Sequence, residues 1–244
     1  MEFRLLDTGT KSAAMNMAID EVLMLSGKPT LRFYDWDPPA VSIGYFQGIE
    51  QEVDLCRAKA EGVDVVRRLT GGGAVFHDKE LTYSFIVPES MGLVSRNILE
   101  SYGQICGFII DGLRSFNINA EFKPINDIIV NGKKISGNAQ TRRDGMVLQH
   151  GTILLDVDVK RMFSILKVPD EKIRDKMISA AEERVTSIKR ELGTTLGADE
   201  LKKTLLDHFK LGTTKSGNLS KTEIQTAEKL SKEKYLSKEW NFRR

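Results

Sequence analysis

Apolar residues follow a helical period in some stretches of the chain and a strand period in others. A helix is predicted from Ser12, which can cap it, to Gly27 and Pro29, which end it. A longer amphipathic helix is predicted over residues 98–113, where apolar residues recur every three or four positions. Shorter β-like runs predict strands, at residues 31–34, 40–45, 63–66 and 81–87.

Two turn signals organise the second half of the chain. Asn131-Gly132 and Asp144-Gly145 are typical of tight hairpins, so three antiparallel segments are predicted within residues 126–158. On the middle segment, alternation of polar and apolar residues predicts one polar face, made by Lys134, Ser136, Asn138 and Gln140. From residue 159 onward the chain is charged and helix-like, and its aromatic tail, residues 235–242, is expected to dock back onto the protein.

Composition narrows the functional classes. The chain has 244 residues, of which 41% are hydrophobic and 29% charged, which is ordinary for a globular protein with a substantial core. Its 36 basic and 34 acidic residues leave a net charge of +2, so no nucleic-acid partner is indicated. We find no apolar run of membrane-spanning length and no signal-peptide pattern at the N-terminus, and expect a cytoplasmic protein without a membrane partner.

The two cysteines give no sign of a disulfide framework or a zinc site. Cys56 and Cys106 lie far apart in the sequence, without a CxxC pair or a neighbouring pair of histidines. We expect both to be buried or half-buried thiols.

A glycine-rich stretch between two predicted strands carries the clearest chemistry. Arg67 and Arg68 precede three consecutive glycines, residues 71–73. Glycines let backbone N–H groups approach an anion closely, and arginine suits phosphate or carboxylate. The stretch is therefore a candidate anion site, although a glycine-rich turn beside two solvated arginines explains it equally. Its spacing fits neither a P-loop nor a dinucleotide-binding loop.

Two further residues are candidates on weaker grounds. Lys134 stands beside a hairpin turn, at the head of the sequence Lys-Ile-Ser-Gly, although most lysines are solvated surface charges. His150 is flanked by strand residues and is equally explained as a core histidine whose hydrogen bonds are satisfied.

Four blocks of sequence, taken together, resemble the lipoate–protein ligase family. They are residues 67–78, Asn126-Asp127, residues 132–140 and residues 149–152, and residues 168–172 and 184–186 extend the resemblance. The resemblance implies an α+β (α/β-type) fold, with a mixed, largely antiparallel β-sheet flanked by helices, as in the biotin/lipoate ligase catalytic domain. It implies one such domain over residues 1–244, of which residues 159–244 are a helical C-terminal part.

The resemblance also implies a reaction. A lipoate–protein ligase uses ATP and Mg²⁺ to convert its substrate, lipoate, to lipoyl-AMP. It then transfers the lipoyl group to a lysine of a lipoyl carrier protein, such as a 2-oxoacid dehydrogenase lipoyl domain or the glycine-cleavage H protein. A lysine between the two reacting anions reduces their repulsion and stabilises the developing charge.

The family's functional residues can be matched one by one. Lys134 matches the catalytic lysine. Nucleotide and adenylate binding is expected from Arg68, Gly73, Ala74, Val75, Phe76, Asp127 and Lys134. Asp127 is also a candidate Mg²⁺ ligand. The acyl pocket is expected to include Gly72, His77 and His150.

Two departures from the family keep alternatives open. Larger ligases carry a C-terminal domain for which this chain has no room, so a separate accessory subunit is a possible partner. Octanoyltransferase relatives use a nucleophilic cysteine just before Asn126, and residues 121–130 contain none. We therefore favour a ligase over two alternatives: an octanoyl or lipoyl transferase that moves the acyl group between carriers without ATP, and a non-catalytic carrier-binding subunit.

Overall fold

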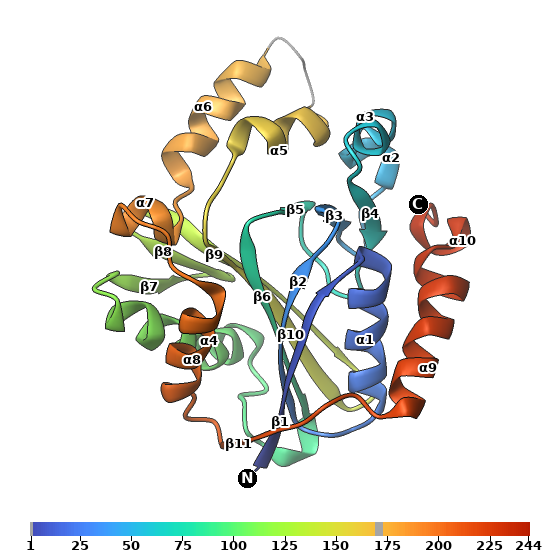
Figure 1. The fold of residues 1–244 in the computed structure, drawn as a ribbon, viewed down its shortest axis with the longest axis vertical. Helices are drawn as coiled ribbons and strands as arrows, with labels where there is room; N and C mark the ends of the chain where they lie inside the picture. The colour runs from blue at the N-terminus through green and yellow to red at the C-terminus, as the bar shows by residue number, and fades with distance from the viewer. Residues whose placement is uncertain (1, 169–172) are drawn as a thin grey trace.

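The structure, a computed structural model, describes residues 2–168 and 173–244, and a large twisted sheet forms its centre (Figure 1). The part of the sequence resemblance at residues 169–172 lies outside the described residues. Within them the sheet has the strand order β11-β1-β2-β6-β10-β9-β8-β7. The strands are β1 Glu2–Lys11, β2 Thr30–Trp36, β6 Glu80–Pro88, β7 Ala120–Lys123, β8 Asp127–Val130, β9 Lys133–Arg143, β10 Met146–Leu154 and β11 Thr213–Ser216.

Strand direction in this sheet is mixed. β1 runs parallel to both β2 and β11, whereas every other neighbouring pair is antiparallel. The predicted hairpins join β8 to β9 and β9 to β10, and their turn residues have positive φ, as two-residue turns of this kind require: Asn131 +50° and Gly132 +77° in the first, Asp144 +53° and Gly145 +73° in the second. The predicted largely antiparallel sheet is confirmed.

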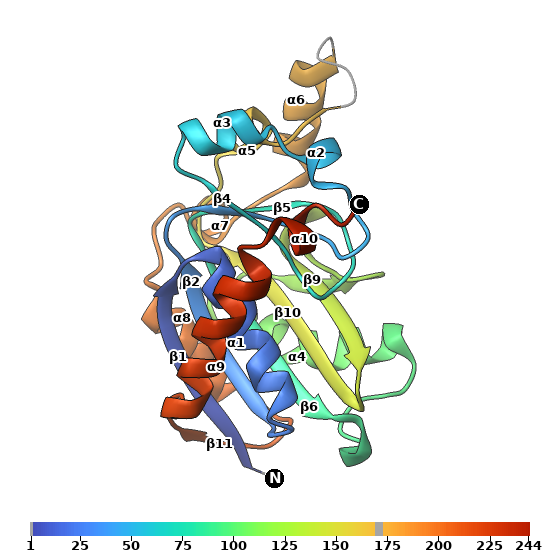
Figure 2. The ribbon, with the colours of Figure 1, turned by 90° about the vertical axis from the view of Figure 1, so that its right-hand side faces the viewer.

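Helices cover both faces of the large sheet. The described residues include α1 Ala13–Leu25, α2 Ile49–Glu52, α3 Leu55–Ala60, α4 Ile98–Ser115, α5 Val159–Ile165, α6 Arg174–Arg184, α7 Ile188–Leu192, α8 Ala198–Asp207, α9 Lys221–Leu230 and α10 Lys238–Asn241. α4 and α8 lie against one face, and α1 with α9 beside it lies against the other (Figures 1 and 2). No described helix is both long enough and apolar enough to cross a membrane.

A second, smaller sheet lies beyond one end of the large one (Figure 2). Its strands are β4 Asp64–Arg67, β3 Ala40–Ile43 and β5 Val75–His77, with β3 in the middle, parallel to β4 and antiparallel to β5. The glycine-rich stretch connects β4 to β5. This sheet therefore positions the candidate anion site against the end of the large sheet.

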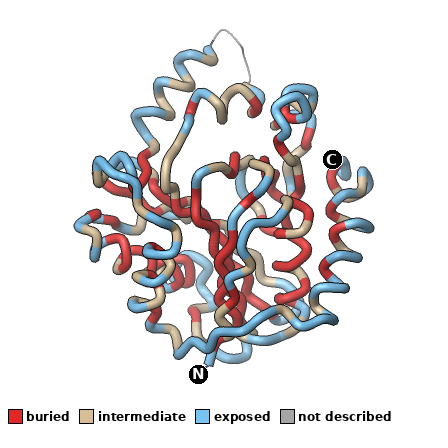
Figure 3. The backbone as a smooth tube through the Cα atoms, viewed as in Figure 1, coloured by how far each residue is buried: buried red, intermediate tan, exposed pale blue. Residues whose placement is uncertain are grey.

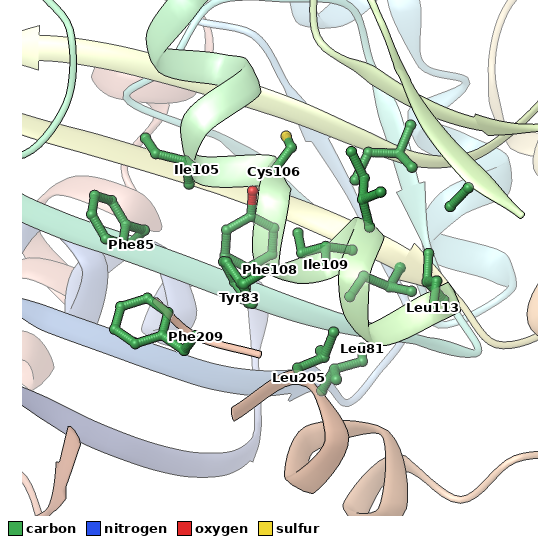
Figure 4. Packing of buried hydrophobic residues seen from close by; sticks show 14 of the residues in the cluster. Leu81, Tyr83, Phe85, Ile105, Cys106, Phe108, Ile109, Leu113, Leu205 and Phe209 are labelled. Atoms are coloured by element: carbon green, nitrogen blue, oxygen red, sulfur yellow. The ribbon is translucent and has the colours of Figure 1, made fainter. Parts of the chain in front are cut away.

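The two faces of the large sheet enclose separate apolar cores, and buried residues concentrate along its central strands (Figure 3). The core under α4 and α8 is rich in aromatic rings, including Tyr83, Phe85, Phe108 and Phe209 (Figure 4). Phe3 belongs to the same core. The core under α1 contains aliphatic and methionine side chains, with Tyr34 and Trp36.

The first predicted helix agrees closely with the structure: α1 begins after Ser12, whose hydroxyl accepts from the Met15 N–H. The predicted docking of the tail is also confirmed, because the Trp240 indole N–H donates to the Arg67 carbonyl at 2.9 Å. Strands β1, β5, β7 and β11 were not predicted from the sequence. β11 is exposed throughout, so it has no apolar alternation to reveal it, and it lies within the part of the chain expected to be helical.

Candidate functional site

A pocket lies between the glycine-rich stretch and strands β6, β9 and β10 of the large sheet. Eight of the residues predicted for the site line it: Arg68, Gly72, Gly73, Ala74, Val75, His77, Lys134 and His150. Phe76 lines a second pocket, which shares Ala74, Val75, Lys134, Gly137 and Thr152 with the first. Asp127 lines neither, although its carboxylate contacts Lys134. The fold thus gathers residues that are up to 82 positions apart in the sequence, from Arg68 to His150.

Lys134 reaches this pocket because of an irregularity in strand β9. In the pairing of β8 with β9, Ile129 lies opposite Lys134 and Ile128 opposite Ser136, so Ile135 is the extra residue of a β-bulge. The Lys134 side chain folds over Gly137, where an added Cβ would lie 2.7 Å from both Cε and Nζ.

The predicted polar face of β9 is therefore confirmed for Ser136, Asn138 and Gln140 and wrong for Lys134. Alternation from Ser136 onward pairs Ser136 with Ile153 and Asn138 with Gly151, on the side of the aromatic core. Because the bulge shifts the register by one, Lys134 shares the opposite side with Gly137. A single sequence cannot reveal such a bulge.

An acidic partner and a neighbouring segment hold Lys134 in place. Its Nζ lies 2.7 Å from Asp127 Oδ1, and both side chains are partly exposed, at 42% and 31%. The Thr186 backbone N–H donates to the Lys134 carbonyl at 2.8 Å, and Val185 forms an isolated parallel bridge with Lys134. The sequence block at residues 184–186 thus docks beside the lysine.

Arg68 contacts the chain itself with every N–H of its guanidinium. Nε donates to Thr70 Oγ1, Nη1 to the carbonyl and hydroxyl of Ser42, and Nη2 to the carbonyls of Gly71 and Gly73, at 2.6 to 3.1 Å. Burial lowers the pKa of this guanidinium to about 10. Arg68 therefore shapes the glycine-rich stretch rather than offering free donors to a phosphate.

The interpretation of Arg67 as an anion ligand is wrong for the same reason. It is fully buried, and its guanidinium donates to main-chain carbonyls from two separate segments: Gly44, Tyr45 and Gln47, and Trp240 and Asn241. Arg67 ties the C-terminal tail to the end of β3.

Two glycines are required by close approach of the backbone. A Cβ on Gly44 would lie 2.0 Å from the carbonyl oxygen of Gly72. Gly72 itself has a φ of +93°, and a Cβ there would lie 2.9 Å from Arg68 Nη2. The glycine-rich stretch therefore packs directly on the end of β3, which the sequence alone did not predict.

His150 belongs to a buried polar network. Its Nε2 lies 2.7 Å from Thr70 Oγ1 and its Nδ1 3.2 Å from Asp20 Oδ2. Burial lowers the pKa of the imidazole, although Asp20 opposes this shift. Burial acts to raise the pKa of Asp20, but Arg32, whose Nη1 lies 2.6 Å away, and His150 hold it below its ordinary value.

His77 has a similar environment on β5. Its Nε2 lies 2.7 Å from Ser42 Oγ, its Nδ1 lies 2.7 Å from Glu80 Oε1, and its ring stacks on Trp36 at 4.0 Å. Glu80 Oε2 has no hydrogen-bond partner among the described residues.

The polar residues that surround both histidines were not predicted from the sequence: Asp20, Arg32, Ser42, Glu80 and Thr82. Asp20 could have been identified, because it interrupts an otherwise apolar face of α1 near Met17 and Leu23. Ser42 and Glu80 could not, because burial of polar residues in short strands depends on contacts distant in the sequence.

Neither cysteine lines this pocket. Cys106 is buried in the aromatic core (Figure 4), where burial raises its pKa to about 12, so the predicted packed thiol is confirmed. The prediction for Cys56 is wrong, because it lies on the outer side of the short helix α3 and is exposed. In the part of the chain that the structure describes, no three His, Cys, Asp or Glu residues form a group that could hold a metal ion.

Comparison with known proteins yields matches over most or nearly all of the chain. The family described as "Lipoyl protein ligase A/B catalytic domain" matches residues 12–210. The octanoyltransferase LipM of Kyrpidia tusciae is 40% identical, with 99% of each chain covered. The octanoyltransferase LipM of Geobacillus kaustophilus is 37% identical, covering 99% of this chain and 98% of the relative.

A solved structure with a closely similar fold comes from an archaeal lipoylation system. It is described as a bipartite lipoate protein ligase and its E2 lipoyl domain from Thermoplasma acidophilum. It superposes with a TM-score of 0.90 at 34% identity, covering 99% of this chain and 96% of that chain. The biotin/lipoate-type fold predicted from sequence is confirmed.

The prediction of an ATP-dependent lipoate–protein ligase is wrong. The curated relatives that match the whole chain are octanoyltransferases, and an enzyme of that class takes an acyl group already activated on a carrier. ATP and Mg²⁺ as cofactors, with free lipoate as substrate, are wrong on the same ground. These relatives favour the alternative weighed beside the ligase, acyl transfer between carriers without ATP.

Proposed function

Because this chain belongs to the lipoyl protein ligase A/B catalytic-domain family, we propose that it is an octanoyltransferase. It takes the octanoyl group from the thioester of one carrier protein and attaches it to a lysine of a lipoyl carrier domain, without ATP. The observation that carries this proposal is the similarity to octanoyltransferases over 99% of the chain. The family and these relatives also favour an enzyme over a non-catalytic carrier-binding subunit.

The hydrogen bonds of Arg67 and Arg68 support a transferase that does not use ATP. Attack on a thioester brings no phosphate into the site, so the reaction does not need free guanidinium groups. Arg67 and Arg68 are both committed to main-chain and hydroxyl oxygens of this chain. The side chains facing the pocket from α1, β2 and β5 include Met17, Trp36 and Val75, which suit an apolar acyl chain.

We assign the chemistry of transfer to Lys134. Attack of the carrier lysine on an acyl carbonyl creates a negatively charged oxygen, and a positioned ammonium group stabilises it. Lys134 Nζ is held by Asp127 over Gly137, at a place shared by both pockets. Its partial exposure leaves room for a substrate to approach from outside.

The test compares Lys134→Ala with Lys133→Ala. Lys133 is adjacent and exposed, lines neither pocket, and so controls for loss of a surface charge. We expect Lys134→Ala to lower the rate of octanoyl transfer to an apo lipoyl domain by roughly 10²-fold or more, and Lys133→Ala to leave it unchanged. The product is measured by intact-protein mass. Equal rates in the two variants would contradict the role of Lys134.

A further inference from the structure

Ser42, His77 and Glu80 form a continuous hydrogen-bonded chain beside the pocket. Ser42 Oγ lies 2.7 Å from His77 Nε2, and His77 Nδ1 lies 2.7 Å from Glu80 Oε1. A hydroxyl, an imidazole and a carboxylate at these separations have the geometry of a nucleophile, its base and the group that orients the base.

Neighbouring donors determine which way the protons of Ser42 and His77 point. Arg68 carries only donors, so its Nη1, 3.1 Å from Ser42 Oγ, donates to that oxygen and leaves the hydroxyl proton of Ser42 free to point elsewhere. Glu80 as a carboxylate accepts from Thr82 Oγ1 at 2.8 Å and from His77 Nδ1. His77 Nε2 is then an acceptor, and the Ser42 proton points to it.

Ser42 and His77 both line the pocket in which we place the acyl group. The cysteines do not line it: Cys106 is buried in the aromatic core under α4 and α8, with a raised pKa, and Cys56 lies on α3. Among the described residues that line the pocket, Ser42 is therefore the one whose hydroxyl is hydrogen-bonded to a histidine.

A second hydrogen-bonded run of a hydroxyl, an imidazole and a carboxylate lies nearby, and it can be compared with the first. Thr70 Oγ1 accepts from Arg68 Nε at 3.0 Å and meets His150 Nε2, which in turn meets Asp20 through Nδ1. Thr70 and Ser42 are both buried, but of the two only Ser42 lines the pocket. The Thr70–His150–Asp20 hydrogen bonds hold Arg68 and His150 in place. The Ser42–His77–Glu80 hydrogen bonds instead lie at the pocket.

We propose that Ser42 accepts the octanoyl group as an ester before it passes to the carrier lysine, an inference that rests on the proposed function. Ser42 Oγ bonds to the thioester carbonyl carbon while its proton moves to His77 Nε2. The carbon–sulfur bond then breaks, and the departing sulfur takes that proton as a thiol.

The second half of the reaction reverses these roles. The neutral amine of the carrier lysine attacks the ester carbonyl carbon and gives a proton to His77. The bond between the acyl carbon and Ser42 Oγ breaks, and that oxygen regains the proton. The products are an amide on the carrier, a free thiol and the unchanged enzyme, so no oxidant, reductant or nucleotide is consumed.

The test traps the acyl-enzyme. Full-length protein is mixed with an octanoyl thioester of an acyl carrier protein, without a lipoyl domain, quenched in acid and mapped by peptide mass spectrometry. We expect one octanoyl group on Ser42, removed by alkaline hydroxylamine as an ester is. It should be absent in Ser42→Ala, retained in Cys106→Ser, and formed roughly 10²-fold more slowly in His77→Gln.

Overall transfer to an apo lipoyl domain is measured in parallel. An octanoylated lipoyl domain without any acyl group on Ser42, or with the group on Cys106 or Lys134, overturns the ester intermediate and leaves the proposed function standing. If neither the enzyme nor the lipoyl domain becomes octanoylated, the proposed function fails, and the proposal for Ser42 fails with it. The wild-type measurement decides between these outcomes even if Ser42→Ala does not fold.

Discussion

The role of an individual residue at this site depends on its buried hydrogen-bond partners, and these are difficult to predict from the sequence. Lys134, Arg68 and His150 were identifiable from their sequence blocks, and all three line the pocket. Their partners Asp20 and Ser42 were not, because a polar residue in a helix or strand gives no sign of what it meets across the fold. The sequence thus identified which side chains gather at the site, but not the network that orients them.

Burial of His150 makes folding sensitive to pH. Its folded pKa lies below the ordinary value of 6.5, so below that pH the unfolded chain binds a proton that the folded protein does not. The free energy of unfolding therefore falls as the pH drops below 6.5, by up to about 1.4 kcal/mol per pH unit. Above pH 6.5, His150 is neutral in both the folded and the unfolded state, so this loss of stability is absent.

Urea denaturation of wild type and His150→Gln between pH 5 and 7.5 measures this effect. We expect a shallower decline of stability with acid in His150→Gln, because glutamine does not titrate. His208→Gln, which removes a histidine hydrogen-bonded to Ser115 at the surface, is the matched control. Parallel pH profiles for wild type and His150→Gln would contradict the prediction.

Elements were predicted well where their pattern was local. α4 was recognisable from its apolar period, and the two hairpins from Asn131-Gly132 and Asp144-Gly145. The edge strand β11 and the bulge at Ile135 were not recognisable, because pairing with a distant strand determines each of them.

The packing of α4 on α8 gives a prediction at this scale. A Cβ on Gly112 would lie 2.8 Å from Leu205 Cδ2 and 3.4 Å from Leu205 Cα, whereas a Cβ on Gly107 meets nothing within 4 Å. Alanine at Gly107 should stabilise the protein by about 0.5–1 kcal/mol through helix propensity. Alanine at Gly112 should instead destabilise it by about 1–3 kcal/mol through overpacking against a buried leucine.

Thermal and urea unfolding of the two variants provide the measurement. Because both substitutions lie on α4, the difference between them isolates the contact with α8 from helix propensity. Equal changes in the free energy of unfolding for Gly107→Ala and Gly112→Ala would contradict the prediction, because they would show that α8 accommodates the added methyl group without loss of stability.

At the scale of the whole molecule, the site exists because a small sheet closes over the end of a large one. Arg67 donates to the segment after β3 and to the C-terminal tail, so the tail helps to hold that arrangement. Sequence resemblance predicted this fold, which the family match and the T. acidophilum structure confirm. It did not predict the reaction, because the same fold serves acyl ligases and acyl transferases alike.

The measurement that tests the account most directly compares two acyl donors. Purified wild-type chain receives an apo lipoyl domain and either an octanoyl thioester of an acyl carrier protein without nucleotide, or free octanoate or lipoate with ATP and Mg²⁺. Lipoyl-domain mass and pyrophosphate release are followed in each. We predict acylation with the thioester alone and no pyrophosphate. Acylation only with ATP, accompanied by pyrophosphate, would contradict the account.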